Sequence, residues 1–215
     1  MPLLEKIAQL TTNCTAAIVV VIQEARNIKA TEEDAEEISS LLTTLGISTK
    51  AIVIQKKQRL SSGHLLGSGK IEEIKKLAVE KKANLIVIDH PVTGPQARNI
   101  EEMTDCTVID RAGVILDIFA KHAKTNAAKI QVEIAQLEYL LPRLAGAWSH
   151  FQRQKGGGVQ ARGMGEQQIE VDRRRARERI ARLHRRLEKI TKERITQRKS
   201  RENELKVAIV GYTNT

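Results

Sequence analysis

The sequence predicts an α/β fold, in which a small parallel sheet with flanking helices is followed by a protruding, long antiparallel helical hairpin of coiled-coil-like type. Short β-branched runs alternate with helical patterns up to about residue 122, which is typical of a parallel sheet. Beyond that point the apolar residues recur at helical spacing, and no strand pattern returns before Val207. We therefore expect an α/β subdomain over 1–123, a hairpin over 124–204, and the first strand of a further domain over 205–215.

Four apolar runs are expected to form the strands. The run Ala16 to Ile22 is continuous and rich in β-branched residues, as expected of a strand buried on both faces. The other runs are interrupted or shorter. The expected strands cover 16–22, about 49–58, 84–89 and 107–110.

Helical patterns lie between these runs. Thr31 is the expected N-cap of the first helix, because three acidic residues follow it where the helix dipole favours negative charge. Leu45-Gly46 is the expected end of that helix, since glycine accepts the left-handed conformation that closes helices. Two further helices are expected over 70–82 and 95–104.

The hairpin is predicted from two long amphipathic stretches. The first, 125–146, is disturbed late by Pro142, and the second runs from Glu166 to about Glu204 without Gly or Pro. The second stretch would span roughly 55 Å, so the hairpin should project with a glycine-rich tip at about 147–165. Apolar residues of the second arm are spaced 4, 3, 4 and 3 apart, as in a coiled-coil seam: Ala176, Ile180, Leu183, Leu187 and Ile190.

Charge is concentrated in one segment of the 215-residue chain. The net charge is +10, and residues 153–201 hold 17 Lys and Arg against 6 Asp and Glu. This excess predicts a polyanionic partner. Cys14 and Cys106 follow no metal or redox spacing, and no apolar run approaches the ~20 residues of a membrane span. With no signal-peptide pattern at the amino terminus, a cytoplasmic protein with reduced thiols is expected.

The predicted tip carries the chemistry of RNA binding. Arg153, Gln154, Lys155 and Arg162 accompany five glycines, so positive charge is combined with backbone that can approach a phosphate closely. Trp148 and Phe151 precede them and could stack on bases, although packing at the hairpin corner is the favoured interpretation for these two rings. The alternative for the whole segment is a flexible interhelical loop.

The second arm of the hairpin is rich in arginine. Its acidic residues can form i,i+4 pairs on a solvated face, but they are too few to neutralise it. The remaining cationic stripe favours contact with a nucleic-acid backbone, without base specificity. The arginines are Arg173, Arg174, Arg175, Arg177, Arg179, Arg182, Arg185 and Arg186.

Other candidate sites are weaker. Gly67-Ser68-Gly69-Lys70 opens a helix and could hold an anion, but the motif lacks the spaced glycines of nucleotide fingerprints, so a tight turn with a cap is favoured. The five histidines are scattered along the chain, and none has the spacing of a metal site or a catalytic triad.

The last residues resemble the start of a phosphate-binding loop. A short apolar strand ends at Val210 and is followed by Gly211, Tyr212, Thr213 and Asn214, which fit the first positions of G-x-x-x-x-G-K-[ST]. A strand with an ordinary glycine turn would look the same. The lysine and hydroxyl that complete the motif are not in the sequence, so no catalytic residue, metal site or cofactor is expected in this chain, and it should not hydrolyse nucleotide alone.

Several blocks of the sequence, taken together in their order along the chain, are distinctive. These blocks are Gly67–Ile74, Gln96–Glu101, Val108–Arg111, Ile115–Ala120, Gln131–Leu137, Leu141–Leu144, Arg162–Glu166, Asp172–Arg174 and Val210–Asn214. From about residue 15 onward the chain resembles the HflX family of ribosome-associated GTPases. The resemblance implies a GTPase domain after the hairpin, of which only the first strand is present here. It also implies GTP and Mg²⁺ as the ligands of the full-length protein.

The resemblance further implies a monomer that binds the large ribosomal subunit near the peptidyl transferase centre and helps to split stalled ribosomes. The implied ribosomal RNA contacts are Arg153, Gln154, Gly156, Gly157, Gly158, Arg162, Gly163 and Gly165, and Lys155 is added to them because of its charge. The implied nucleotide contacts are Gly211, Tyr212, Thr213 and Asn214. The chain departs from the family pattern at Lys155, Gln160, Met164 and 126–128, which bears on the geometry of the tip and of the hairpin base.

Two other functions fit the residues. A general nucleic-acid-binding coiled-coil module without nucleotide turnover would need only the basic segment. An enzyme acting on a nucleotide would have to use Gly67 to Lys70.

Overall fold

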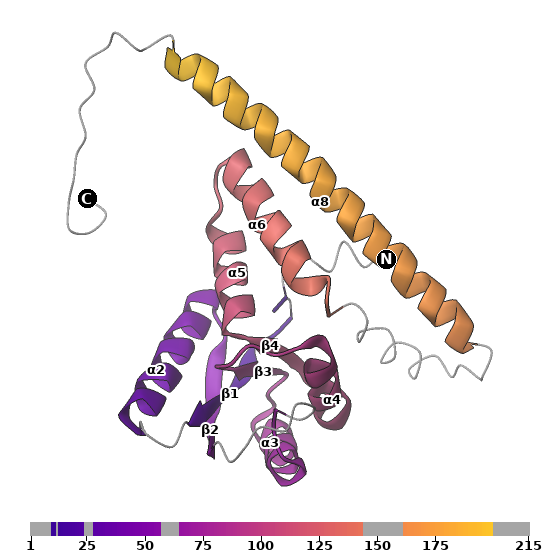
Figure 1. The fold of residues 1–215 in the computed structure, drawn as a ribbon. Coiled ribbons are helices and arrows are strands. Elements are labelled where there is room, and N and C mark those ends of the chain that lie inside the picture. Colours follow the sequence, from indigo (N-terminus) through magenta and orange to yellow (C-terminus); the bar gives the residue numbers. More distant parts are fainter. Residues whose placement is uncertain (1–9, 12, 24–27, 57–64, 144–160, 200–215) are drawn as a thin grey trace.

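The chain forms a four-stranded sheet with helices on both faces, from which a pair of helices extends (Figure 1). The structure, a computed structural model, describes residues 10–11, 13–23, 28–56, 65–143 and 161–199. The α/β class and the long helical extension predicted from the sequence are confirmed.

All four strands are parallel. They are β1 (Ala16–Gln23), β2 (Ser48–Lys56), β3 (Leu85–Ile88) and β4 (Thr107–Asp110), in the order β2-β1-β3-β4. β1 pairs with β2 and β3, and β3 pairs with β4. The continuous apolar run β1 is therefore central, whereas β2, whose residues alternate more in exposure, lies at an edge.

Two helices cover each face of the sheet. α2 (Ile28–Leu45) and α5 (Arg111–His122) pack on one face, through a cluster that includes Val19 of β1. α3 (Ser68–Lys81) and α4 (Gly94–Thr104) pack on the other face. Neighbouring residues of β1 thus point into two separate cores, as the period of two in a strand requires.

Local signals explain most helix boundaries. Gly46 has φ +86°, and Lys82 and Asp105 also adopt the left-handed conformation at the ends of α3 and α4. The Asp110 side chain caps α5 by accepting from the Gly113 N–H at 3.1 Å. Thr125 caps the next helix in the same way, accepting from the Ala128 N–H at 3.1 Å.

The structure differs from the expectations about the α/β region in two places. α2 begins at Ile28, so Thr31 lies inside the helix as a buried residue and is not its N-cap. The sequence analysis assigned no element to α5, because Asp110 ends β4 and caps the next helix without an intervening turn. The second strand ends at Lys56, within the expected range.

The extension consists of α6 (Asn126–Leu140) and α8 (Ala161–Lys199), which run in opposite directions (Figure 1). The seam residues predicted on α8 pack against α6, with Ala176 and Leu183 at 1% and 3% exposure. α6 is shorter than expected and ends at Leu140, two residues before Pro142, which cannot continue a helix. α8 begins at Ala161, before Glu166, and so includes Gly163 and Gly165, each at a cost of about 1 kcal/mol relative to alanine.

A buried carboxylate ties the segment before β1 to this region. Asp117 of α5 accepts from the Leu10 and Thr11 N–H groups at 3.0 and 2.7 Å, and from the Thr11 hydroxyl at 2.8 Å. It also accepts from Gln136 Nε2 of α6 at 3.1 Å. Asp117 therefore joins three parts of the chain. Among the helices described, none combines the length and the apolar composition needed to cross a bilayer.

Candidate nucleic-acid interface on the helical hairpin

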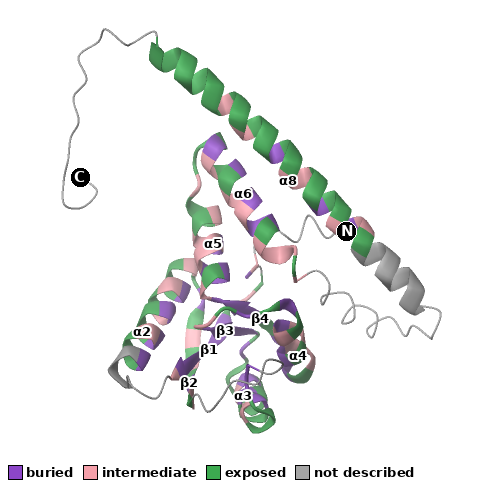
Figure 2. Cartoon of the chain, viewed as in Figure 1, coloured by how far each residue is buried: buried purple, intermediate pink, exposed green. Residues whose placement is uncertain are grey.

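The outer face of α8 is basic and exposed (Figure 2). Between Glu170 and Lys199 the helix carries thirteen Arg and Lys against five Asp and Glu. Side chains seven positions apart share a face about 10 Å apart along a helix. Two such rows follow the helix, and each member is exposed: Arg175, Arg182 and Lys189 in one row, Arg185, Lys192 and Lys199 in the other.

Ion pairs neutralise only part of this face. Arg174 and Glu178 are 4.0 Å apart, and the Arg177–Glu170 pair spans 3.7 Å with both side chains more than half exposed. Pairs this long and exposed contribute little. No ion pair holds Arg182, Arg185 or Arg186 in the described part of the chain, so their guanidinium groups remain available to an anion.

One arginine serves the hairpin itself. Arg179 Nε donates to Glu133 Oε1 of α6 at 2.8 Å, which joins the two helices beside their apolar seam. This hydrogen bond to Glu133 raises the pKa of Arg179. Arg179 therefore belongs to the packing of the hairpin, whereas the exposed arginines form the basic face.

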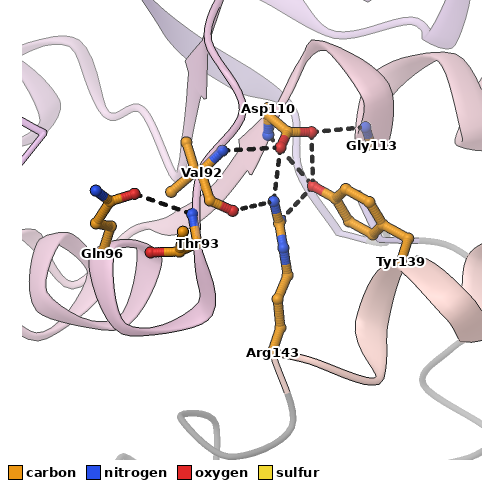
Figure 3. Close-up of polar contacts among 7 residues, drawn as sticks. All are labelled: Val92, Thr93, Gln96, Asp110, Gly113, Tyr139 and Arg143. Carbon is orange, nitrogen blue, oxygen red and sulfur yellow. Dashed lines mark hydrogen bonds and ion pairs between the residues drawn. The ribbon is translucent and has the colours of Figure 1, made fainter. Parts of the chain in front are cut away.

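A buried polar cluster joins the carboxyl end of α6 to the sheet (Figure 3). Arg143 Nη2 donates to Asp110 Oδ2 at 2.7 Å and to the Val92 carbonyl oxygen at 2.8 Å. The Tyr139 hydroxyl donates to Asp110 Oδ1 at 2.9 Å and accepts from Arg143 Nη1. The Val92 and Gly113 N–H groups donate to the same carboxylate, each at 3.1 Å. We call Asp110, Tyr139 and Arg143 the hairpin-root cluster.

Burial explains the chemistry of this cluster. The Arg143 and Asp110 side chains are 13% and 7% exposed. Burial raises the pKa of Tyr139, against the opposing effect of the nearby Arg143, so the hydroxyl keeps its proton and donates. The Arg143 guanidinium also lies 3.9 Å from the centroid of the Tyr139 ring, which adds a cation–π contact.

Two glycines permit this close approach. A Cβ on Gly94, in the first turn of α4, would lie 2.8 Å from the Pro142 carbonyl oxygen. A Cβ on Gly113 of α5 would lie 2.7 Å from the Tyr139 hydroxyl oxygen. Both distances are shorter than a carbon–oxygen contact allows. The end of α6 is therefore seated on two helices of the α/β subdomain.

The sequence analysis missed the role of the hairpin-root cluster. An aspartate at the end of an apolar strand and three residues before a glycine signals a helix cap, and that part of the geometry was readable. Its partners Tyr139 and Arg143 are 29 and 33 residues away, and no local pattern connects them.

The structure places the secondary candidate Gly67–Lys70 at the start of a helix. Gly67 and Lys70 open α3, but Lys70 Nζ is 2.7 Å from Glu73 Oε2, and a Cβ on Gly67 or Gly69 would meet nothing within 4 Å. No other part of the described chain therefore packs closely against Gly67 or Gly69, and the motif forms the beginning of α3. No group of three potential metal-ligating side chains occurs within the ranges described.

Comparison with known proteins identifies the family. A family model described as "GTP-binding GTPase N-terminal" matches residues 32–120, and one described as "GTP-binding GTPase Middle Region" matches residues 122–201. GTPase HflX of Flavobacterium psychrophilum is 43% identical over 197 residues, covering 92% of this chain and 48% of that protein. GTPase HflX of Escherichia coli K12 is 41% identical over 184 residues, covering 85% and 43%. The chain belongs to the HflX family.

The chain spans a little under half the length of these HflX relatives. The border between the two matching models, at residues 120–122, falls at the carboxyl end of α5. The first HflX model therefore covers most of the α/β subdomain, and the second covers α6, α8 and the residues between them.

Solved structures agree with this fold. A GTP-binding protein from the archaeon Sulfolobus solfataricus in complex with GDP has a TM-score of 0.55 at 21% identity, covering 82% of this chain and 46% of that one. A complex of SsGBP and GDP has a TM-score of 0.59 at 23% identity, covering 91% and 49%. At such identities the likeness supports the architecture of this HflX-family chain and nothing about its ligands.

Most residues expected as contacts lie outside the described residues. This holds for Arg153, Gln154, Lys155 and Gly156–Gly158, and also for Gly211–Asn214. Arg162, Gly163 and Gly165 fall in the first turns of α8, where the backbone is helical and not a loop. The proposed RNA-binding segment therefore continues directly into the basic helix.

Proposed function

We propose that this chain is the ribosome-binding region of an HflX-type GTPase, and that the α6–α8 hairpin contacts ribosomal RNA of the large subunit near the peptidyl transferase centre. The single observation that carries this proposal is a set of exposed arginines on α8, Arg182, Arg185 and Arg186, that no acidic side chain neutralises within the described residues. Family membership directs the choice among polyanions toward the ribosome.

The physical basis is charge neutralisation combined with reach. Each Arg or Lys that meets a phosphate releases condensed counterions, so the exposed basic residues of α8 would supply affinity without reading sequence. A helix of 39 residues can carry these charges well away from the α/β subdomain. Arg153, Lys155 and Arg162 would extend the same chemistry toward the segment before α8.

The nucleotide chemistry belongs to the full-length protein. We propose that it binds and hydrolyses GTP with Mg²⁺ and helps to split or recycle stalled ribosomes in the cytoplasm. In this chain Gly211 to Asn214 would form the first part of the phosphate-binding loop, and backbone N–H groups would supply the phosphate contacts there.

Co-sedimentation with purified large ribosomal subunits tests the RNA-binding proposal. The unmodified chain should pellet with the subunits, and the combined variant Arg153→Glu, Lys155→Glu, Arg162→Glu should lose binding by about 100-fold or more, since three phosphate contacts become repulsive. Arg182→Glu with Arg186→Glu should weaken binding in the same direction.

The matched control is Lys75→Glu with Lys76→Glu. These exposed lysines lie on α3, and their reversal changes the net charge as much as the α8 pair does. If both double variants weaken binding equally, net charge alone governs association and the hairpin has no special role.

The same arginines also favour a second function, because exposed guanidinium groups along a helix can bind phosphates without recognising particular bases. Under this alternative the chain is a general nucleic-acid-binding module. Equal affinity for ribosomal subunits and random RNA duplexes at every salt concentration would support it, whereas preference for the subunits would support the ribosomal proposal.

A further inference from the structure

The α6 helix is held to the α/β subdomain at two polar points. In its last third, Gln136, 3% exposed, donates to Asp117 of α5 at 3.1 Å. Just beyond its carboxyl end, Arg143 binds Asp110 and the Val92 carbonyl. These points are seven residues apart in sequence, and the second lies three residues beyond the last residue of the helix. One fixed point leaves a helix free to pivot, and two fixed points define its direction.

The second point has the properties of a specific geometric constraint. An arginine whose Nη2 group donates to a carboxylate and a carbonyl, and whose Nη1 group donates to a hydroxyl, is held in one orientation, whereas apolar side chains can slide. Buried ion pairs contribute little net stability, so their main effect can be specificity of arrangement. Tyr139 adds two hydrogen bonds to the same carboxylate and guanidinium, and Gly113 leaves room for its hydroxyl.

The constraint also reaches three elements of the subdomain. Asp110 ends β4 and caps α5, and it accepts from the Val92 N–H in the segment between β3 and α4. Arg143 donates from Nη2 to Asp110 and to the Val92 carbonyl oxygen, so it links the end of α6 to both. The direction of α6 is thereby set relative to the sheet, and α8 follows α6 through their shared apolar seam.

We propose that the hairpin-root cluster is a latch that fixes the direction of the α6–α8 hairpin, with Arg143 as a positioning residue that presents the basic face of α8 without itself touching RNA. The effect of the latch on RNA binding rests on the proposed function. Its effect on hairpin direction does not.

Distance measurements test the direction of the hairpin. Nitroxide labels at Val79→Cys on α3 and Lys192→Cys on α8, both exposed positions, would be placed in a chain carrying Cys14→Ala and Cys106→Ala. Pulsed electron paramagnetic resonance should give one narrow distance distribution. Arg143→Ala and Tyr139→Phe should each broaden the distance distribution while the helix content stays unchanged. Arg143→Lys keeps the positive charge but loses the planar guanidinium group, so its distribution should have an intermediate width.

The matched control is Arg98→Ala. Arg98 is another partly exposed arginine with an acidic partner, Glu102 at 2.9 Å, but it lies on α4 away from α6. Its removal should leave the distance distribution narrow. Should Arg143→Ala fail to fold, Tyr139→Phe decides the question, since it removes one oxygen only. A narrow, unshifted distribution in a folded latch variant overturns the proposal.

The salt dependence of ribosomal-subunit binding separates positioning from contact. If the binding-competent direction falls to about a tenth of the population, Arg143→Ala weakens binding about tenfold. The slope of log K against log salt should stay unchanged, whereas Arg182→Ala, which removes a proposed phosphate contact, should reduce it by about one. A reduced slope for Arg143→Ala would show direct RNA contact and contradict a positioning role.

The two proposals can fail separately. If the unmodified chain does not bind ribosomal subunits, the proposed function is wrong, and the distance distributions still decide whether the latch exists. If binding occurs and the latch variants bind and orient normally, the latch is wrong and the proposed function stands.

Discussion

Asp89 is a carboxylate in an unfavourable position at the carboxyl end of β3. Its side chain is 8% exposed, and Oδ1 accepts from the Ile22 N–H at 3.1 Å and contacts His90 Nδ1 at 3.0 Å. Burial raises the pKa of Asp89, and the nearby His90 only partly opposes this effect. Asp89 therefore helps to join β1 to β3, but its charge is poorly solvated.

The sign of this effect gives a pH prediction. Because the folded pKa lies above the ordinary value of 3.8, the stabilising contribution is full below that value and is lost as pH rises through the folded pKa. Asp89→Asn keeps an oxygen for the Ile22 N–H and removes the charge. We expect Asp89→Asn to raise the unfolding free energy by up to about 1 kcal/mol at neutral pH and to leave it unchanged at about pH 3.

Urea unfolding at the two pH values would measure this difference. Glu72→Gln, an exposed carboxylate on α3, is the control and should change stability little at either pH. A loss of stability for Asp89→Asn at neutral pH would show that the contact with His90 outweighs the cost of burying the charge.

At the scale of elements, the strands were readable from the sequence because each is an apolar run that the sheet buries. β3 and β4 lie within their predicted ranges, and β1 extends one residue further. α5 was not assigned, because its beginning shares Asp110 with β4. The packing of α6 against α5 could not be predicted either. In the sequence Gly113 looks like an ordinary helix residue, and only the structure shows that Tyr139 lies against it.

A pair of glycine substitutions tests that packing. Gly113→Ala should destabilise the protein by about 1–3 kcal/mol, because its Cβ would lie 2.7 Å from the Tyr139 hydroxyl oxygen and α6 or Tyr139 would have to move. Gly69→Ala in α3 meets nothing within 4 Å and should be neutral or stabilising by up to about 1 kcal/mol. Equal effects in thermal unfolding would contradict a tight contact at Gly113.

At the scale of the whole molecule, the apolar residues form separate cores. Two lie on the faces of the sheet, and a third joins α6 and α8. Heptad-like spacing predicted the third core because seam residues are local in sequence. The direction of the hairpin was not predictable, since it depends on Asp117 and Asp110 meeting residues 19 and 33 positions away. The proposed RNA and nucleotide contacts outside the described residues stay predictions.

Separate cores predict separate responses to core substitutions. Leu183→Ala removes a side chain that is 3% exposed between α6 and α8, and should destabilise the hairpin by about 2–5 kcal/mol. Amide hydrogen exchange should quicken along α8 and stay slow in β1 and β3. Ile86→Ala in β3, which is fully buried, should instead quicken exchange throughout the sheet. Uniform quickening in both variants would show a single cooperative unit.

The uninterrupted length of α8 makes it a lever. Its contact with α6 includes Leu183, and Lys199 lies about 24 Å further along the helix axis. A rotation of about 10° at that contact would move Lys199 by about 4 Å, while the side chains near the fulcrum would hardly shift. A small rotation where α8 contacts α6 therefore produces a larger displacement at Lys199. Conversely, a displacement of Lys199 would rotate α8 only slightly at that contact.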